Sequence, residues 1–411
     1  MSGGRTIVGR RASTAEGSAN GAGLRKLTGT TMPTAPAISV LTGIFCTVGL
    51  VMVGSSSTLV SVSQGGAVWS IFEKQVLWML LGAVLALIAV RVNYHLWQRL
   101  SRLILLVTLG LLVMVLMTAP SVDGAGRWIG VGMLKIQPSE LMKFALVVFV
   151  ADLLTRRADR SDEPRMQIGP VVLVLGLAGL LVMAQPDMGT TMVLVFIAFA
   201  VMFMAGVKTV PLAKTAGVFF LLAVGFTFSS HYRKERFFSF LHQSGVTSGA
   251  GYQVSQSKVY LGSGHTFGVG LLGGQGGYTI LPNAHTDFIF SIIGEELGLV
   301  GALAVMGLFF ALALFGYRAA LRAPDRFGSL MAMGITTWII TQAVINIGTD
   351  IGVMPVTGIP LPFISYGGTS LVVNLMAMGI LVNIAMKGDA VAASGQVTPL
   401  RPSKRPRPVT V

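Results

Sequence analysis

The sequence predicts an all-α, polytopic membrane protein with about ten transmembrane helices. Of its 411 residues, 53% are hydrophobic and only 11% are charged, and the mean hydropathy is +0.74. The apolar residues fall in repeated runs, and a helix needs about 20 of them to cross a bilayer. Because lipid cannot bond to backbone groups, helices are the structure expected for such runs.

The candidate spans follow one another along most of the chain. They lie near residues 36–60, 75–91, 103–119, 138–155, 168–185, 189–206, 211–229, 287–316, 328–348 and 368–386. One long connection, residues 231–284, separates the seventh span from the eighth. Its aromatic and aliphatic residues, such as those in Phe237–Leu241, predict a large extracytoplasmic loop with elements at the membrane interface.

The net charge of +14 is a topology signal. With the N-terminus in the cytoplasm, most Lys and Arg residues fall on the cytoplasmic side, as the positive-inside rule requires. We therefore expect a protein of the cytoplasmic (inner) membrane with both termini in the cytoplasm, and no nucleic-acid binding. Residues 36–387 form the predicted membrane domain, and the basic tails 1–35 and 388–411 are predicted to be disordered. The single cysteine, Cys46, excludes an intrachain disulfide.

Asp287 is the strongest candidate for chemistry. It follows His285 and Thr286 at the mouth of the eighth span. Ionisable groups near membrane depth are costly to desolvate and usually mark a functional site. The structural alternative is a helix N-cap, where an acid also meets the helix dipole favourably. For His285, a hydrogen bond to the backbone is a simpler explanation than zinc, which lacks further ligands here.

Glu295 and Glu296 lie in the same span as Asp287. Neighbouring residues of a continuous helix point in different directions, so we expect at most one to face the protein interior. One of the two is expected to be structural and to pair with a base such as Arg127 or Lys143.

Residues 268–273 spell a GxGxxG pattern without the strand that a dinucleotide site requires. We therefore expect no nucleotide, and interpret these glycines as flexible backbone that approaches a bulky ligand.

Further polar residues are predicted to open on the same outer face. Pro138 and Glu140 suit the start of the fourth span, and Asp187 suits a helix N-cap. Arg127 lies beside Trp128 in a Gly-rich segment. It suits an interfacial cation and a phosphate ligand equally well. We expect these segments to share an outward-facing cavity.

Several motifs in fixed order carry a resemblance to a known family. They are Gly126–Gly130, Gln137–Lys143, Gln185–Thr190, Ala284–Phe290, Gly294–Gly298 and Pro360–Gly368. In these stretches the chain resembles the SEDS family of membrane peptidoglycan glycosyltransferases, and most of all its division type. One departure is Gly273–Tyr278, where many division-type members carry a lysine.

The resemblance implies a ten-helix fold that polymerises lipid II on the outer membrane face, with Asp287 as the catalytic residue. It also implies a class B penicillin-binding protein as partner, alongside other division or elongation proteins. The residues expected to bind substrate are Arg127, Gln137, Ser139, Glu140, Lys143, Gln185, Asp187, Lys258, His285, Thr286, Glu296, Ser365, Tyr366 and Gly367.

The expected chemistry is general-base activation of a sugar hydroxyl by Asp287. The pyrophosphate leaving group requires positive charge, from Arg127, Lys143 and Lys258 or from a divalent cation such as Mg²⁺ or Mn²⁺. A lipid-linked-precursor flippase would also use intramembrane acids, and a scaffold that recruits a crosslinking enzyme would need none. Clustering of the acids at one face favours the enzyme.

Overall fold

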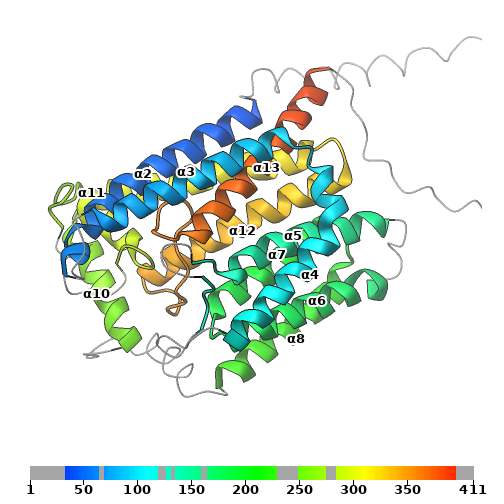
Figure 1. The fold of residues 1–411 in the computed structure, drawn as a ribbon, viewed down its shortest axis with the longest axis horizontal. Helices are drawn as coiled ribbons and strands as arrows, with labels where there is room; N and C mark the ends of the chain where they lie inside the picture. Colours follow the sequence, from blue (N-terminus) through cyan, green and yellow to red (C-terminus); the bar gives the residue numbers. More distant parts are fainter. Residues whose placement is uncertain are drawn as a thin grey trace, which may run out of the picture. The chain divides into compact units, whose positions relative to one another are not determined.

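The computed structural model describes residues 33–63, 69–118, 126–130, 135–158, 164–228, 249–274 and 284–394. Almost all of this part of the chain is helical (Figure 1). The predicted tails up to residue 32 and from residue 395 onward lie outside the described residues. So do residues 229–248, with Phe237–Leu241, and the stretch 275–283, which holds most of the Gly-rich departure.

Every predicted span coincides with a helix. The helices are α2 (Thr34–Ser63), α3 (Ser70–Arg91), α4 (His95–Thr118), α5 (Pro138–Arg156), α6 (Pro164–Ala184), α7 (Met188–Met204), α8 (Thr209–Phe228), α11 (Ile289–Arg322), α12 (Arg326–Asp350) and α13 (Thr369–Ala393). A further helix, α10 (Gly249–Ser263), lies within the long connection before the eighth span. The last helix continues past residue 386, where the apolar run was predicted to end.

Length and hydropathy qualify eight of the described helices to cross a membrane, which makes this a multi-pass membrane protein. Helix α7 is shorter, and α5 carries charged residues including Glu140, Lys143 and Asp152. These charges are buried inside the protein and not in lipid, which is where intramembrane charges are tolerated. The count of about ten spans stays a prediction.

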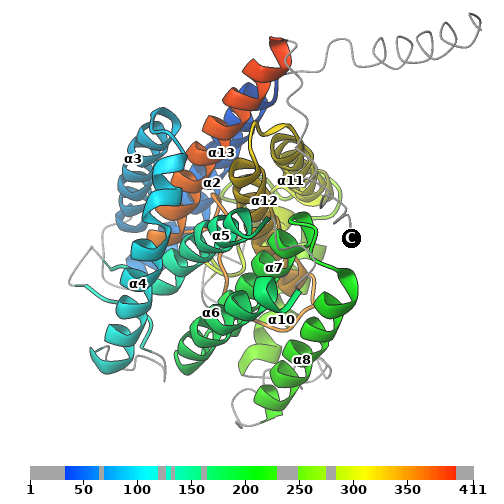
Figure 2. The ribbon, with the colours of Figure 1, turned by 90° about the vertical axis from the view of Figure 1, so that its right-hand side faces the viewer.

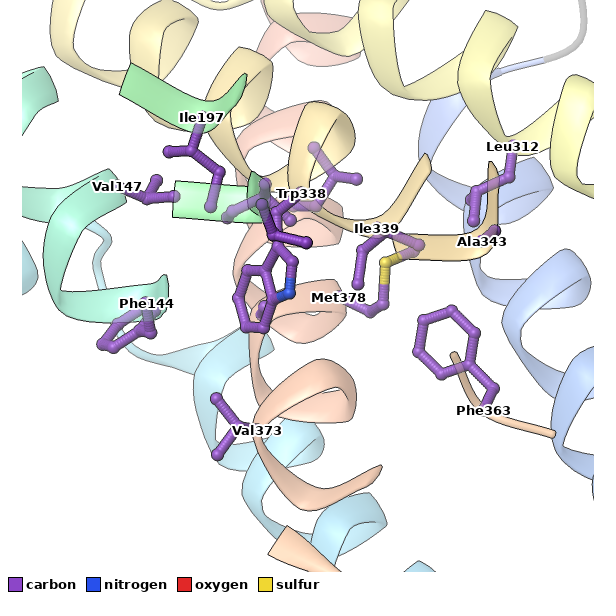
Figure 3. Close-up of a cluster of buried hydrophobic side chains, with 14 of the residues drawn as sticks. Phe144, Val147, Ile197, Leu312, Trp338, Ile339, Ala343, Phe363, Val373 and Met378 are labelled. Carbon is purple, nitrogen blue, oxygen red and sulfur yellow. The ribbon is translucent and has the colours of Figure 1, made fainter. Parts of the chain in front are cut away.

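Helices α12 and α13 form the centre of the bundle. Their apolar stretches are 78% and 89% buried, against 6% for α8, which lies at the edge in Figures 1 and 2. Helix α12 packs on α5, α7 and α11, and α13 packs on α2 and α3. The fully buried Trp338 of α12 lies in a cluster with Phe144, Ile197 and Met378, which also includes Phe363 from the connection before α13 (Figure 3).

Helix α11 is interrupted at Gly298, whose backbone angles are φ 69° and ψ −169°. The backbone groups around this kink bond to residues 265–270. Leu299 N donates to His265 O at 2.9 Å, and Val269 N donates to Glu295 O at 3.0 Å. The loop before α11 is therefore joined to both sides of the kink, so the backbone groups freed there are satisfied.

Close packing explains the glycines of the loop. A Cβ added at Gly268 would lie 2.1 Å from Glu296 O, and one at Gly264 would lie 1.9 Å from Gly294 O. The interpretation of residues 268–273 as flexible backbone that approaches a ligand is thus wrong at Gly268, which packs against α11.

Replacing Gly298 with alanine should destabilise the protein by on the order of 1–3 kcal/mol, because only glycine adopts this backbone conformation without strain. The added Cβ would also lie 2.4 Å from Gly268 N. Thermal unfolding in detergent would measure the loss. Gly307→Ala is the matched control: it lies in the same helix with nothing within 4 Å of an added Cβ, and should be neutral or stabilising. Equal midpoints for the two variants would contradict this account of the kink.

Candidate active site

Asp287 lies where the connection before α13 meets the start of α11. The side-chain amide of Asn346 donates to Asp287 O at 2.7 Å and to Ile359 O at 2.9 Å. The N-cap position of α11 is Phe288, one residue after Asp287. The first turn of α11 is capped from α12, where Asp350 Oδ2 accepts from Ser291 N at 3.1 Å and from Ser291 Oγ at 3.3 Å.

Arg127 and Asp287 border the same small space at Gly358. A Cβ added at Gly358 would lie 3.6 Å from Asp287 Oδ2 and 4.0 Å from Arg127 Nη1. Arg127 is held there by the end of α6: its Nε donates to Gln185 O at 2.9 Å and its Nη2 donates to Pro186 O. A carboxylate and a guanidinium, distant in sequence, therefore border the same position in the connection before α13.

His285 and Tyr366, from two different motifs, are neighbours. Tyr366 N donates to His285 O at 3.0 Å, and the ring centroids are 5.8 Å apart. Burial lowers the pKa of His285 to about 4, so its imidazole is neutral at physiological pH. Burial also raises the pKa of the Tyr366 phenol. Thr286 belongs to the same turn.

Gln137, Ser139 and Asp187 form a polar cluster at the starts of α5 and α7. Asp187 Oδ2 accepts from Ser139 Oγ at 3.2 Å and from Gln137 Nε2 at 3.4 Å, while its Oδ1 accepts from Thr190 N at 3.0 Å. The predicted N-cap role of Asp187 is confirmed. The Gln185 amide reaches Leu112 O at 3.2 Å. These contacts fix the helix starts next to Arg127.

Glu140 and Lys143 form a buried ion pair within α5. Lys143 Nζ lies 2.8 Å from Glu140 Oε2 and 2.7 Å from Gln342 Oε1, and the Lys143 side chain is completely buried. Helix α5 does start at Pro138 as predicted, but the Glu140 carboxylate is committed to Lys143. This placement favours a structural role for Lys143 over direct contact with a pyrophosphate.

Glu295 and Glu296 correct the prediction made for a continuous helix. Both are only 3% exposed, and the loop that covers the kink at Gly298 encloses them. Glu296 Oε1 accepts from Ser55 Oγ at 2.5 Å. The expected partner Lys143 is bonded to Glu140 instead.

The remaining predicted site residues have separate surroundings. Ser365 is buried and closes its own turn, accepting from Leu361 N at 2.8 Å. Gly367 O accepts from Ser370 N at 2.7 Å, at the start of α13. Lys258 lies on α10, where its Nζ would be 2.8 Å from a Cβ added at Gly352. The substrate-binding roles assigned to all these residues stay predictions.

The sequence reasoning missed the polar residues of α12. Gln342, Asn346 and Asp350 are essentially inaccessible to solvent, yet they contact α5, α11 and the connection before α13. Two features of the sequence could have identified these residues. Asp350 is an acid at the end of an apolar span, and the three residues recur at intervals of four, which places them on one helix face.

The chain belongs to the FtsW/RodA/SpoVE family. The family model described as "Cell cycle protein" matches residues 36–389. Among curated relatives, stage V sporulation protein E of Bacillus subtilis is 36% identical over 360 residues, covering 87% of this chain and 98% of that protein. The probable peptidoglycan glycosyltransferase FtsW of Coxiella burnetii is 38% identical over 354 residues, covering 83% and 93%.

Solved structures share the fold. A structure described as "Structural coordination of polymerization and crosslinking by a peptidoglycan synthase complex" superimposes with a TM-score of 0.70 at 26% identity, covering 85% of this chain and 97% of that one. The crystal structure of Thermus thermophilus rod shape determining protein RodA gives 0.62 at 26% identity, covering 85% and 95%.

Lys143→Met should destabilise the protein by about 3–5 kcal/mol, because it leaves the Glu140 carboxylate buried without a counter-charge. The double variant Glu140→Gln, Lys143→Met should recover much of that loss, since neither charge then remains. Apparent thermal midpoints in detergent would compare the variants. A single variant as stable as the double would show that the pair does not need mutual neutralisation.

Acidification from pH 7 toward pH 4 should destabilise the protein in part through His285. The unfolded imidazole takes up a proton near pH 6.5, whereas the folded one resists protonation down to about pH 4. The unfolded state therefore binds more protons in this window, and the free energy of unfolding decreases as the pH is lowered. His285→Gln should flatten the dependence of the unfolding midpoint between pH 7 and pH 5. An unchanged slope would contradict the burial of a neutral imidazole.

Proposed function

We propose that this protein is a peptidoglycan glycosyltransferase that polymerises lipid II into glycan strands at the outer face of the cytoplasmic membrane. Membership of the FtsW/RodA/SpoVE family and relatives named as probable peptidoglycan glycosyltransferases support the activity. The observation that carries the assignment of the site is the approach of the Asp287 carboxylate and the Arg127 guanidinium at Gly358.

Asp287 acts as general base in this proposal. It takes the proton from a sugar hydroxyl of the acceptor lipid II, and the resulting oxygen nucleophile attacks the anomeric carbon of the growing strand. The bond from that carbon to undecaprenyl pyrophosphate breaks, and the anomeric configuration inverts. A hydroxyl is a weak nucleophile at neutral pH, so a positioned base is the main requirement of this reaction.

Arg127 supplies positive charge for the leaving pyrophosphate, which carries its negative charge away without needing a strong acid. The fixed guanidinium is suited to phosphate oxygens because its donors are planar and always charged. A buried Lys143 does not serve this purpose directly, and Lys258 on α10 is the next candidate.

Mg²⁺ or Mn²⁺ would supply additional charge if bound. Among the described residues, no group of three or more His, Cys, Asp or Glu side chains could hold a metal ion.

We further propose a class B penicillin-binding protein as the partner, and septal synthesis during division as the process. A solved relative is itself part of a complex that coordinates polymerisation and crosslinking, and several curated relatives carry the division-type name FtsW. The basic residues set the orientation, with both termini in the cytoplasm.

Asp287→Asn should reduce polymerisation to background, because an amide cannot accept the proton of the acceptor hydroxyl. Binding of lipid II should persist, since the shape of the site is kept. The assay would mix purified protein with lipid II and Mg²⁺, with and without a class B penicillin-binding protein, and resolve the strands on a gel.

The control is Glu73→Gln, which removes an exposed acid from the first turn of α3. It should polymerise like the wild type. Normal strand synthesis by Asp287→Asn would remove Asp287 from the role of base. Wild-type protein that transports lipid II across vesicles without forming strands would favour the flippase alternative.

A further inference from the structure

One face of α12 runs through the centre of the protein as a line of buried polar side chains. Trp338, Gln342, Asn346 and Asp350 recur every fourth residue, and none is more than 1% exposed. Trp338 Nε1 donates to Gln342 Oε1 at 3.0 Å, so the first two residues of this line are bonded to each other. At its outer end this face meets the non-helical chain around Asp287.

The connection between α12 and α13 needs such partners. Residues 352–368 are not helical, yet Leu361, Phe363 and Ile364 are buried in the bundle. Backbone carbonyls in a buried, non-helical segment cannot bond to lipid and must be satisfied within the protein. Gln342 Nε2 donates to Pro360 O at 2.9 Å, and Asn346 Nδ2 donates to Ile359 O at 2.9 Å.

Asn346 bonds to the main chain of two segments that border the candidate site. Its Nδ2 reaches Asp287 O as well as Ile359 O. Ile359 directly follows Gly358, the residue at which Asp287 Oδ2 and Arg127 Nη1 come together. This side chain therefore links the turn that carries the carboxylate to the segment that borders it.

Only one orientation of the Asn346 amide allows both of these hydrogen bonds. Both contacts on the Nδ2 side are carbonyl oxygens, which accept and cannot donate. A flipped amide would place Oδ1 against both, so the bridge requires Nδ2 in its observed position. Oδ1 is buried without a partner, which shows that the two carbonyl contacts dominate the placement of this side chain.

We propose that Asn346 is a positioning residue for the general base, acting through the bridge from Asp287 O to Ile359 O. This role rests on the proposed function. Asn346 does not contact substrate, because it is 1% exposed and its donor group is engaged by main-chain atoms. Asp350 lies one helical turn after Asn346 in α12. It stabilises the start of α11, just after Asp287, by accepting a hydrogen bond from Ser291 N.

The test is the kinetics of Asn346→Leu, which keeps the approximate volume of the side chain and removes both donors, with Asn346→Asp as the second variant. Lipid II polymerisation by the full chain with its penicillin-binding partner would give kcat and KM. Displacement of the base slows the chemical step without weakening substrate binding. We therefore expect kcat to fall roughly 10- to 100-fold, with KM changed less than about threefold.

The matched control is Asn383→Leu, which removes another buried amide that donates to a backbone carbonyl, Val90 O, at the opposite end of the bundle. It should keep kcat even where its thermal midpoint falls as far as that of Asn346→Leu. Equal losses of kcat in the two variants would reduce the effect to general destabilisation and overturn the proposal.

Two other results would overturn it. Both Asn346 variants could keep a wild-type kcat in folded protein, which would show that the bridge is dispensable. Alternatively, KM could rise with kcat unchanged, which would make Asn346 part of substrate binding. Wild-type protein that forms no strands would overturn the proposed function itself, whereas full activity of Asn346→Leu beside an active wild type would overturn this role alone.

Discussion

The structure depends on satisfying a buried, non-helical backbone inside a helical membrane protein. The chain between α12 and α13 leaves helical geometry and enters the bundle, where every carbonyl needs an internal partner. Glutamine and asparagine side chains of α12 provide those partners. Neighbouring helices make room for the segment: Gly49 of α2 lies against Phe363 O, and Gly189 of α7 lies against Ile359. Any side chain at these glycines would displace the segment that borders Asp287.

The same requirement explains how the loop before α11 is fixed to that helix. The kink at Gly298 exposes backbone groups within a span, and residues 265–270 bond to them on both sides. The loop thus binds to backbone groups that the kink leaves free, and these hydrogen bonds stabilise the kinked conformation of the helix. Since α11 begins two residues after Asp287, the loop and the candidate base are attached to one rigid element.

Sequence patterns predicted the helices well because an apolar run of sufficient length has few alternatives in a bilayer. They also grouped Arg127, Asp187 and Asp287 on one side, since alternation of the spans decides which ends share a face. They failed at Glu295 and Glu296, because the kink that admits both to the interior is created by contact with a distant loop. They also did not predict that Lys143 pairs with Glu140 one turn away, because the burial of this pair depends on contact with Gln342 of α12. Asn346 was missed because a single amide within an apolar span stands out only when it is considered together with Gln342 and Asp350 on the same helix face. Its importance comes from which carbonyls it meets.

The arrangement separates the group that performs chemistry from the groups that hold it. Asn346 bonds to the main chain of Asp287, and Asp350 bonds to the first turn of α11. Both contacts are made to main-chain atoms, so they hold the backbone on which the carboxylate stands. A backbone held at two points on one helix face cannot move without breaking these hydrogen bonds. In a lipid-exposed enzyme this is an effective way to keep a base in place, because the loss of each buried bond costs about 1–3 kcal/mol.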